Sequence, residues 1–338
     1  MRDIREFFKY LGKPSKIVVT MHQKPDADAM GSSLGLQLML EKLGHSVTTI
    51  SPTNWPGFLN WLPKCSQVID FENKKEFCQG VISEAEIIFC LDFNDLNRTR
   101  GMESLLANAG GVKVLIDHHQ EPQVHAFSYG LSDTDKGSTA EMVYDFIVES
   151  GNRHLIDENI ASCLYAGVMT DTGSFRFPST TASAHLMVAD LKSTGFDHFR
   201  VHELIFDTFL ENRLRFFGHI LLNRMDVNYE LNTVLIAIPK NDLLRFDIKT
   251  GDTEGLVNYP LSMLGIRLAA IVIDRDEERK WSFRSKGDID VNQFARQYFS
   301  GGGHKNAAGG RSSLSLEECV LQFNKVLPTL ADKLSGEY

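Results

Sequence analysis

Carboxylate and imidazole side chains gather in four short stretches of the sequence, each directly after an apolar or helical segment. In chain order they are His22 with Asp26 and Asp28, then Asp92, then Asp117 with His118 and His119, and finally Asp171. A single Asp often caps a helix or starts a turn. Helix caps need no histidines, so capping does not explain four such stretches that together contain three histidines. Crowded carboxylates also repel one another unless cations are bound, so we interpret these residues as metal ligands.

The types of these side chains indicate the metal. Aspartate and histidine without cysteine favour manganese or magnesium over structural zinc. Six or seven candidate ligands are too many for one ion, but they suit two ions that share a carboxylate. Paired divalent ions of this kind are the usual centre for hydrolysis of phosphate esters.

The elements around these residues predict an α/β fold. Apolar or β-branched strands alternate with helical patterns, which favours a parallel sheet covered on both faces. In such a sheet, ligands bind beyond the carboxyl ends of the strands. The expected strands are 16–21, 46–50, 86–91 and 112–116, and the expected helices are 32–43, 140–149, 160–169 and 181–193. The stretch Ser138-Thr139-Ala140-Glu141 is expected to cap the helix that it starts.

A second, smaller α/β domain is expected in the C-terminal part. Its candidate strands are 233–238, 268–273 and 280–284, with helices at 292–298 and 315–335. We therefore expect two domains, 1–195 and 225–338, joined by a helical linker at 196–224. The glycine-rich stretch 301-GGGHKNAAGG-310 is expected to be a loop; it is either a flexible turn or a phosphate-binding loop.

Together these motifs resemble the DHH phosphoesterase superfamily, whose signature is the tripeptide Asp117-His118-His119. The stretch from His22 to Asp28, Asp92 and Asp171 match the other metal motifs of that family in the same order. The resemblance implies that His22, Asp26 and Asp92 hold one metal, and that Asp28, Asp92, His118 and Asp171 hold the other. It also implies that His119 faces the scissile phosphate in a catalytic role and that Asp117 orients His118 or its loop by hydrogen bonding.

The C-terminal half resembles the DHHA1 domain that accompanies DHH domains. Its stretches 301–310 and 281–291 are similar to the GGGH and Arg-Ser features of that domain. The resemblance implies that 1–195 is a metal-binding catalytic domain and that 225–338 is a substrate-binding domain. The implied substrate-binding residues are His119, Arg284, Gly302, Gly303, His304 and Lys305. Size and layout are similar to the NrnA-like branch of the superfamily, which implies two Mn²⁺ ions, with Mg²⁺ or Co²⁺ as substitutes.

The composition of the chain limits the classes of substrate and the cellular location that we expect. The net charge is −9, so no broad basic surface for long duplex nucleic acid is expected. No apolar run approaches the roughly 20 residues that a bilayer-spanning helix needs. Five scattered cysteines without metal or disulfide spacing fit a reducing compartment. We therefore expect a cytoplasmic protein that does not bind membranes. A homodimer is compatible with the sequence.

The resemblance implies manganese-dependent hydrolysis of short single-stranded RNA oligonucleotides or linear dinucleotides to mononucleotides. It also implies a second substrate, 3'-phosphoadenosine 5'-phosphate (PAP), which would be converted to AMP. Within the same superfamily, the alternatives are a pyrophosphatase or exopolyphosphatase and a processive RecJ-like exonuclease, which would need further nucleic-acid-binding domains. A non-catalytic nucleotide-binding module is the remaining alternative, but it predicts a lost metal ligand, and each motif position carries the expected residue type.

Overall fold

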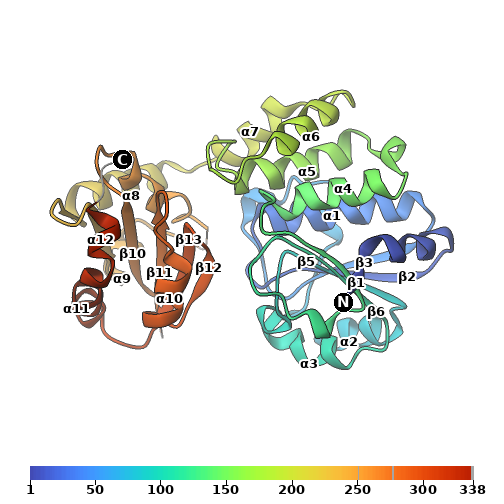
Figure 1. Cartoon of the computed structure of the whole chain (residues 1–338), viewed down its shortest axis with the longest axis horizontal. Helices are drawn as coiled ribbons and strands as arrows, with labels where there is room; N and C mark the ends of the chain where they lie inside the picture. Colours follow the sequence, from blue (N-terminus) through green and yellow to red (C-terminus); the bar gives the residue numbers. More distant parts are fainter. Residues whose placement is uncertain (250, 276–277, 336–338) are drawn as a thin grey trace. The chain divides into compact units, whose positions relative to one another are not determined.

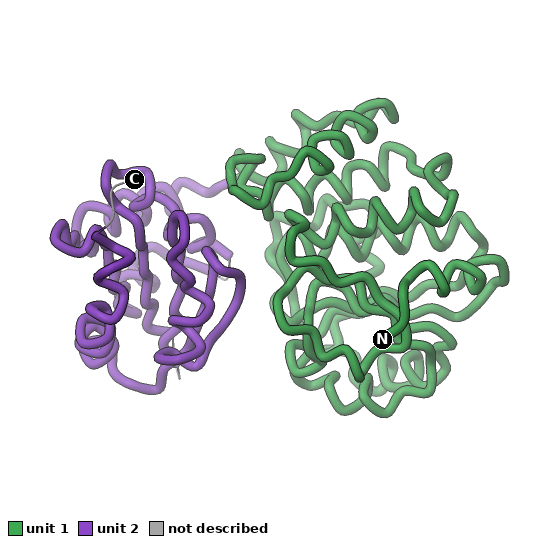
Figure 2. The backbone as a smooth tube through the Cα atoms, in the orientation of Figure 1, with its two compact units in different colours: residues 1–208 green, residues 209–338 purple. Residues whose placement is uncertain are grey.

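The computed structural model describes residues 1–249, 251–275 and 278–335. The chain divides into two compact units, Met1–Thr208 (unit 1) and Phe209–Tyr338 (unit 2), drawn in separate colours in Figure 2. The division falls inside the stretch 196–224 that the sequence predicted as a linker. Helix α7 (His198–Phe206) belongs to unit 1 and helix α8 (Glu211–Asn223) to unit 2.

Unit 1 is built on a parallel sheet. Within the described residues it has seven strands in the order β1-β7-β6-β5-β2-β3-β4, and every neighbouring pair is parallel. The strands are β1 (Arg2–Asp3), β2 (Lys16–Thr20), β3 (Ser46–Ser51), β4 (Ile69–Asp70), β5 (Ile87–Leu91), β6 (Val112–Asp117) and β7 (Tyr129–Ser132). The short strands β1, β4 and β7 carry too few apolar residues to have been predicted.

Helices cover both faces of this sheet, as the sequence predicted. Alternate residues of β2 point to different cores: Ile17 and Val19 to one, Val18 to the other. Helices α1 (Ala27–Lys42), α4 (Thr139–Glu149), α5 (Glu158–Asp171) and α6 (Ala182–Lys192) lie on one side, and α2 (Lys75–Glu84) and α3 (Glu103–Asn108) on the other (Figure 1). The continuous apolar strands are explained by this double coverage.

Helix α1 begins five residues before the predicted start at Ser32. Asp26 is its N-cap and accepts hydrogen bonds from the amides of Asp28 and Ala29, at 3.0 Å each. The prediction missed this start because the first turn carries aspartates, which are poor residues inside a helix but good ones at its N-terminus. As a result, Asp28 lies on a helix and not in a loop.

Unit 2 contains a mixed sheet, with six strands among the described residues, in the order β12-β13-β11-β10-β9-β8. Only β9 and β10 pair in parallel, and the other neighbours are antiparallel. The strands are β8 (Met225–Asn228), β9 (Thr233–Ile238), β10 (Leu268–Arg275), β11 (Glu278–Ser285), β12 (Gly302–His304) and β13 (Ala307–Ser312). The glycine-rich stretch is therefore a β-hairpin, and its prediction as a loop was wrong.

Two apolar cores sandwich the sheet of unit 2. Phe216 of α8 and Leu243 of α9 (Lys240–Arg245) belong to one core. Phe294 of α10 (Val291–Tyr298) and Phe323 of α11 (Leu316–Val326) belong to the other, around the fully buried Trp281. The predicted helix 315–335 is interrupted, because a 3-10 turn precedes α12 (Ala331–Leu334).

Short 3-10 helices complete the two units. They are η1 (Ile4–Gly12), η2 (Gly57–Leu59), η3 (Cys65–Gln67), η4 (Leu96–Met102), η5 (Val124–Ala126), η6 (Arg153–Leu155), η7 (Leu256–Asn258), η8 (Pro260–Ser262) and η9 (Leu327–Leu330). Within the described part of the chain, no helix combines the length and the apolar content that crossing a bilayer requires.

Candidate metal centre

Three neighbouring strands of unit 1 deliver the first residues of the site to one edge of the sheet. Strands β2, β5 and β6 are adjacent, and His22, Asp92 and His118 follow their carboxyl ends. The Asp92 amide donates a hydrogen bond to the Ile116 carbonyl at 3.1 Å, which keeps Asp92 beside the end of β6. Parallel topology therefore brings together residues that are far apart in the sequence.

Asp92 lies between two histidines. Its Oδ2 is 3.4 Å from His22 Nε2, and its Oδ1 is 3.5 Å from His118 Nε2. The residue is 2% exposed. Its φ is +62°, a left-handed conformation that is uncommon for residues other than glycine. Backbone strain of this kind concentrates at functional sites.

His22 and Asp26 form one side of the site. The Gln23 carbonyl accepts a hydrogen bond from His22 Nδ1 at 2.8 Å, so that Nε2 is turned towards the carboxylates. Asp26 uses Oδ1 to cap α1, and its Oδ2 lies 3.8 Å from His22 Nε2. One ligand atom each of His22, Asp26 and Asp92 lies within 4.8 Å of the others. The three side chains are thus close enough to share one ion.

His118 occupies the other side with Asp28 and Asp171. Its Nδ1 donates to the Lys136 carbonyl at 3.3 Å. Its Nε2 lies 3.3 Å from Asp171 Oδ2, at the last residue of α5, and 3.9 Å from Asp28 Oδ2. Ligand atoms of Asp28, Asp92 and His118 again lie within 4.8 Å of one another. Asp92 therefore belongs to both groups.

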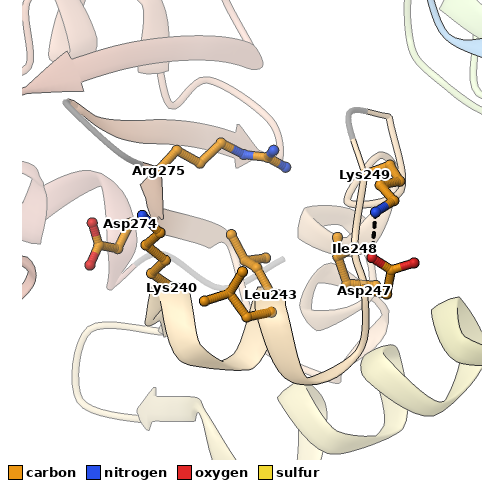
Figure 3. A pocket seen from close by; sticks show the side chains of 8 residues that line it. Lys240, Leu243, Asp247, Ile248, Lys249, Asp274 and Arg275 are labelled. Carbon is orange, nitrogen blue, oxygen red and sulfur yellow. Dashed lines mark hydrogen bonds and ion pairs between the residues drawn. The ribbon is translucent and has the colours of Figure 1, made fainter.

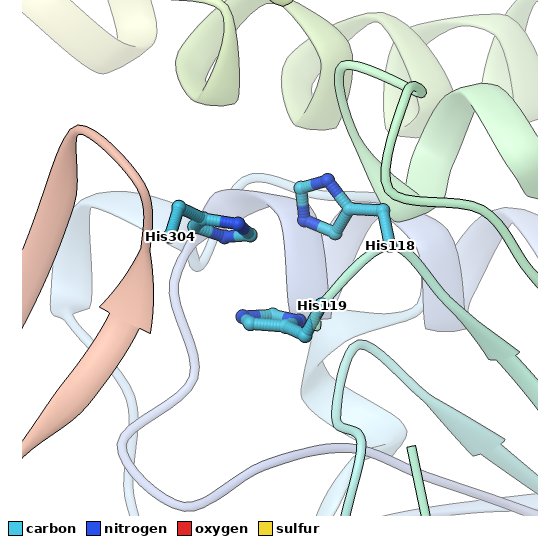
Figure 4. Close-up of side chains that lie close together, drawn as sticks. All are labelled: His118, His119 and His304. Atoms are coloured by element: carbon cyan, nitrogen blue, oxygen red, sulfur yellow. The ribbon is translucent and has the colours of Figure 1, made fainter. Parts of the chain in front are cut away.

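His119 makes a different contact. Its Nδ1 donates to Asp117 Oδ1 at 2.7 Å, and Asp117 is fully buried. The rings of His118 and His119 follow the same strand but are inclined by 75°, with centroids 4.9 Å apart (Figure 4). The sequence predicted that Asp117 orients His118 or its loop, but in the structure the side chain that Asp117 holds is that of the next residue, His119.

Close helix packing places Asp28 and Asp171. A Cβ on Gly31 of α1 would lie 2.4 Å from the Cys163 carbonyl oxygen of α5. A Cβ on Gly167 of α5 would lie 2.7 Å from Asp28 Oδ1 and 2.6 Å from the Cβ of Ala140. Real side chains do not approach so closely, so these positions require glycine. The two glycines let α1, α4 and α5 meet at the site.

The crowded carboxylates of the site shift the pKa values of one another and of the neighbouring histidines. Burial and the repulsion from Asp92 and Asp171 raise the pKa of Asp28 well above its usual value. Burial opposes the charge on Asp92, but hydrogen bonds from His118 and His22 outweigh it and hold its pKa well below normal. Burial likewise opposes the charge on His118, but Asp92 and Asp171 outweigh it and raise its pKa. Bound cations would relieve this repulsion between the carboxylates.

The Asp117–His119 pair has shifted pKa values of its own. Burial lowers the pKa of His119 well below its usual value, and the nearby charge of Arg98 lowers it further. Burial and the charge of Asp92 raise the pKa of Asp117 to about 6. Paired groups with shifted pKa values in one buried location are typical of catalytic sites.

The predicted substrate-binding residues of unit 2 lie on β11 and the β12–β13 hairpin. Arg284 is half-buried and donates to the Phe283 carbonyl at 3.0 Å. The Gly303 amide donates to Asn292 Oδ1 at 2.9 Å, so this donor is already used within unit 2. A Cβ on Gly303 would lie 2.4 Å from the Ala307 carbonyl oxygen. Gly303 thus allows the two hairpin strands to approach.

The remaining substrate candidates, Gly302, His304 and Lys305, belong to the same hairpin. Gly302 and His304 are half-buried and Lys305 is exposed. A separate pocket in unit 2, of about 180 Å³, is lined by Lys240, Leu243, Leu244, Asp247, Ile248, Lys249, Asp274 and Arg275 (Figure 3). None of the predicted site residues lines it, and Lys249 and Asp274 are paired with Asp247 and Arg279.

Sequence reasoning missed the contacts that Thr139, the first residue of α4, makes with two candidate ligands. Thr139 donates its hydroxyl to Asp92 Oδ1 at 2.9 Å, and its amide donates to Asp28 Oδ2 at 2.7 Å. The predicted N-cap is confirmed at Ser138, whose hydroxyl accepts from the Glu141 amide. Its capping pattern was the available signal, but a cap pattern does not show which carboxylates its free amides will meet.

Comparison with known proteins agrees with this geometry. The "DHH family, N-terminal domain" model matches residues 16–168, and the "DHHA1 domain" model matches residues 232–334. The "Probable bifunctional oligoribonuclease and PAP phosphatase NrnA" of Streptococcus mutans is 28% identical, over 92% of this chain and 94% of that protein. The Bacillus subtilis protein named "Bifunctional oligoribonuclease and PAP phosphatase NrnA" is also 28% identical, over 90% and 91%.

A solved structure extends the likeness over both units. An "exopolyphosphatase-related protein" of Bacteroides fragilis superposes with a TM-score of 0.94 at 36% identity, over 98% of this chain and 97% of that chain. The family models cover the strands that carry the acidic and histidine side chains as well as the β12–β13 hairpin. The chain belongs to the DHH phosphoesterase family and carries a DHHA1 domain.

Proposed function

We propose that this chain is a phosphoesterase with two divalent ions that hydrolyses short RNA oligonucleotides and linear dinucleotides to mononucleotides, and PAP to AMP. The observation that carries the proposal is the position of Asp92, with one carboxylate oxygen towards His22 and the other towards His118. A carboxylate placed in this way is suited to be shared by two ions. The names of the NrnA relatives support the substrate class.

The donor set fits this assignment. His22, Asp26 and Asp92 would hold one ion, and Asp28, Asp92, His118 and Asp171 the other. Both histidines donate Nδ1–H to a backbone carbonyl, the usual orientation of a metal-binding imidazole. Oxygen and imidazole ligands without thiolate favour Mn²⁺, with Mg²⁺ or Co²⁺ as substitutes. When bound, such ions supply an activated water and offset the charge of the phosphate group.

His119 would act on the substrate directly. Asp117 fixes its ring through Nδ1, so Nε2 is the atom that meets the phosphate. Burial favours the neutral ring, and an arriving phosphate group favours its protonated form. His119 can therefore donate Nε2–H to a phosphate oxygen, and then pass the proton to the leaving oxygen.

Unit 2 would bind the part of the substrate that does not react. Arg284 offers a planar fork of donors suited to phosphate oxygens. His304 and Lys305 add two further donors from the β12–β13 hairpin, and Gly302 leaves the backbone of the hairpin accessible. Because Gly303 already donates its amide to Asn292, we assign Gly303 the role of shaping the hairpin. The absence of a net basic charge agrees with short substrates and not with long duplexes.

We also propose that the enzyme acts in the cytoplasm. The five cysteines are all free thiols and all buried, which suits a reducing compartment.

A substrate panel with Mn²⁺ tests the function. We expect hydrolysis of RNA dimers and short oligomers, linear dinucleotides and PAP, and loss of activity on chelation. Asp92→Asn should abolish turnover, whereas Asp157→Asn should keep it, because Asp157 only caps α5 and pairs with Lys42. Retained activity in Asp92→Asn would contradict the proposal. No turnover of any phosphoester with metal bound would favour a non-catalytic module.

A second candidate function is hydrolysis of polyphosphate or pyrophosphate. The name of the Bacteroides fragilis protein, at 36% identity over nearly the whole chain, favours it. The same panel separates the two functions when tripolyphosphate and pyrophosphate are included. Hydrolysis of these compounds without cleavage of RNA dimers or PAP would overturn the nucleotide substrate and leave the metal centre in place.

A further inference from the structure

The segment 136–141, which runs into the first turn of α4, contacts both sides of the candidate metal centre. The Lys136 carbonyl accepts Nδ1–H of His118 at 3.3 Å. The Thr139 hydroxyl donates to Asp92 Oδ1 at 2.9 Å. The segment supplies no metal ligand of its own in the proposed centre, yet it fixes the orientation of two of the ligands.

The same segment holds a third ligand through the N-terminus of α4. The amides of Thr139 and Ala140, the first two residues of the helix, donate to the two oxygens of Asp28 at 2.7 and 2.9 Å. The amide of the third residue, Glu141, donates to the Ser138 hydroxyl at 3.1 Å. Two of the first-turn donors that a helix normally leaves unsatisfied are thus directed at a ligand from α1, and the third is satisfied by the N-cap.

Glu141 anchors the segment. It is fully buried, and the proposed reaction does not use it. Its Oε2 accepts from the Gly137 amide at 3.1 Å, and its Oε1 lies 3.1 Å from Lys136 Nζ. Ser183 of α6 also donates to Oε1. A buried carboxylate with several donors is strongly directional, so Glu141 fixes the backbone on either side of Thr139.

We propose that Thr139 is a positioning residue for the metal centre, and that Glu141 anchors the segment through which His118, Asp28 and Asp92 are held in place. The inference rests on the proposed metal-dependent function. Thr139 is fully buried, so its hydroxyl has no competing water. Its donation to Asp92 sets which lone pairs of that carboxylate face the ions. Loss of outer hydrogen bonds of this kind commonly weakens metal binding by about 10- to 100-fold.

Thr139→Val tests the role of the hydroxyl, because it keeps the shape and removes the donor. We expect calorimetric titration with Mn²⁺ to show affinity weakened about 10-fold or more, and the Mn²⁺-induced rise in melting temperature to shrink. Thr139→Ser keeps the hydroxyl and should restore affinity close to that of the unmodified protein. Mn²⁺ affinity unchanged in Thr139→Val would overturn the inference.

Thr49→Val is the matched control. Thr49 is also buried, and it donates to a side-chain oxygen, Gln37 Oε1, at 2.8 Å. Its loss should lower stability without changing Mn²⁺ affinity. If Thr139→Val and Thr49→Val lose Mn²⁺ affinity equally, the loss reflects lower stability of the fold, and the positioning role of Thr139 is rejected.

Glu141→Gln provides a second variant if Thr139→Val does not fold. It keeps the volume but places an amide opposite Lys136 and Ser183. We expect weaker Mn²⁺ binding, and binding equal to that of the unmodified protein would reject the anchor. The unmodified protein separates the two hypotheses. If it binds no Mn²⁺, the proposed function itself fails; if it binds Mn²⁺ and the variants bind equally well, only the positioning role fails.

Discussion

The two units treat charge in opposite ways. Unit 1 buries most of its candidate carboxylates and imidazoles: Asp28, Asp92 and His118 are each at most 5% exposed, while Asp26 and Asp171 are half-buried. Unit 2 leaves its candidate groups half-buried or exposed, on strands and a hairpin. Burial strengthens every electrostatic contact but demands a partner for each charge, whereas an open surface can release its ligand. The difference agrees with the proposed roles, chemistry in unit 1 and reversible binding in unit 2.

The architecture follows the same division. Unit 1 collects residues from three adjacent parallel strands and the ends of α1 and α5, so its site depends on long-range packing. The candidates of unit 2 lie close together in sequence, on β11 and the adjoining hairpin. A disturbance far from the chemistry should therefore damage the first site more than the second. Four predictions test this contrast, in order of expected effect.

The largest effect is expected from His119→Asn. The change removes the proposed proton donor without removing a metal ligand, so kcat should fall by about 100- to 10,000-fold while Mn²⁺ affinity changes little. Steady-state hydrolysis of an RNA dimer and calorimetric titration measure the two quantities. His125→Asn, at an exposed histidine, should leave both unchanged. Parallel loss of metal affinity would make His119 a ligand.

Gly167→Ala should come next. The added methyl would meet Asp28 Oδ1 and Ala140 at less than 3 Å, so α5 or α1 must shift. A displacement near 1 Å costs about 100-fold in rate, and overpacking costs about 1–3 kcal/mol in the free energy of unfolding. Activity assays and denaturant unfolding check both. Normal activity would show that the site tolerates movement of these helices.

Arg284→Ala examines the other unit. Loss of a charge-assisted hydrogen bond is worth about 1.5–3 kcal/mol, so KM should rise by about 10- to 100-fold with kcat nearly unchanged. Arg279→Ala on the same strand is the control, since Arg279 is paired with Asp274. A fall in kcat without a change in KM would place Arg284 in the chemistry and erase the contrast between the units.

The smallest effects are expected from Gly80→Ala in α2 and Gly218→Ala in α8. Both glycines lie inside helices, and a Cβ at either would meet no atom within 4 Å. Each change should stabilise its unit by about 0.5–1 kcal/mol. Separate unfolding transitions, each raised by only one of the variants, would show that the units unfold independently. A single shared transition would show that they unfold together.

The sequence predicted the α/β character and the parallel sheet of unit 1 because long apolar strands and acidic strand ends are strong local signals. It also placed His22, Asp92 and His118 at strand ends, where the structure has them. It could not give the start of α1, because Asp26 and Asp28 resemble loop residues until the cap is formed. It could not give the hairpin at 302–312 either, since glycine-rich strands lack side-chain patterning and depend on pairing with β11.

The contacts of Thr139 and the packing of Gly167 lay beyond sequence reasoning for a different reason. The Thr139 contacts and the Gly167 packing both depend on how closely separate helices approach each other in space. Residues of α1 and α4 that are in contact lie more than 100 positions apart in the sequence. A hydroxyl near a helix start has the same local pattern whether it meets solvent or a buried carboxylate. Only the crossing of α1, α4 and α5 distinguishes the two.

The left-handed backbone at Asp92 has one more consequence. Aspartate and asparagine adopt that conformation more readily than other residues with side chains, so exchange of a single oxygen for nitrogen would leave the fold at this turn intact. A copy of the gene with that change would yield a protein that melts normally and still carries an intact unit 2, yet turns over nothing. Relatives that have lost activity would then be identified most readily by an asparagine at the position of Asp92.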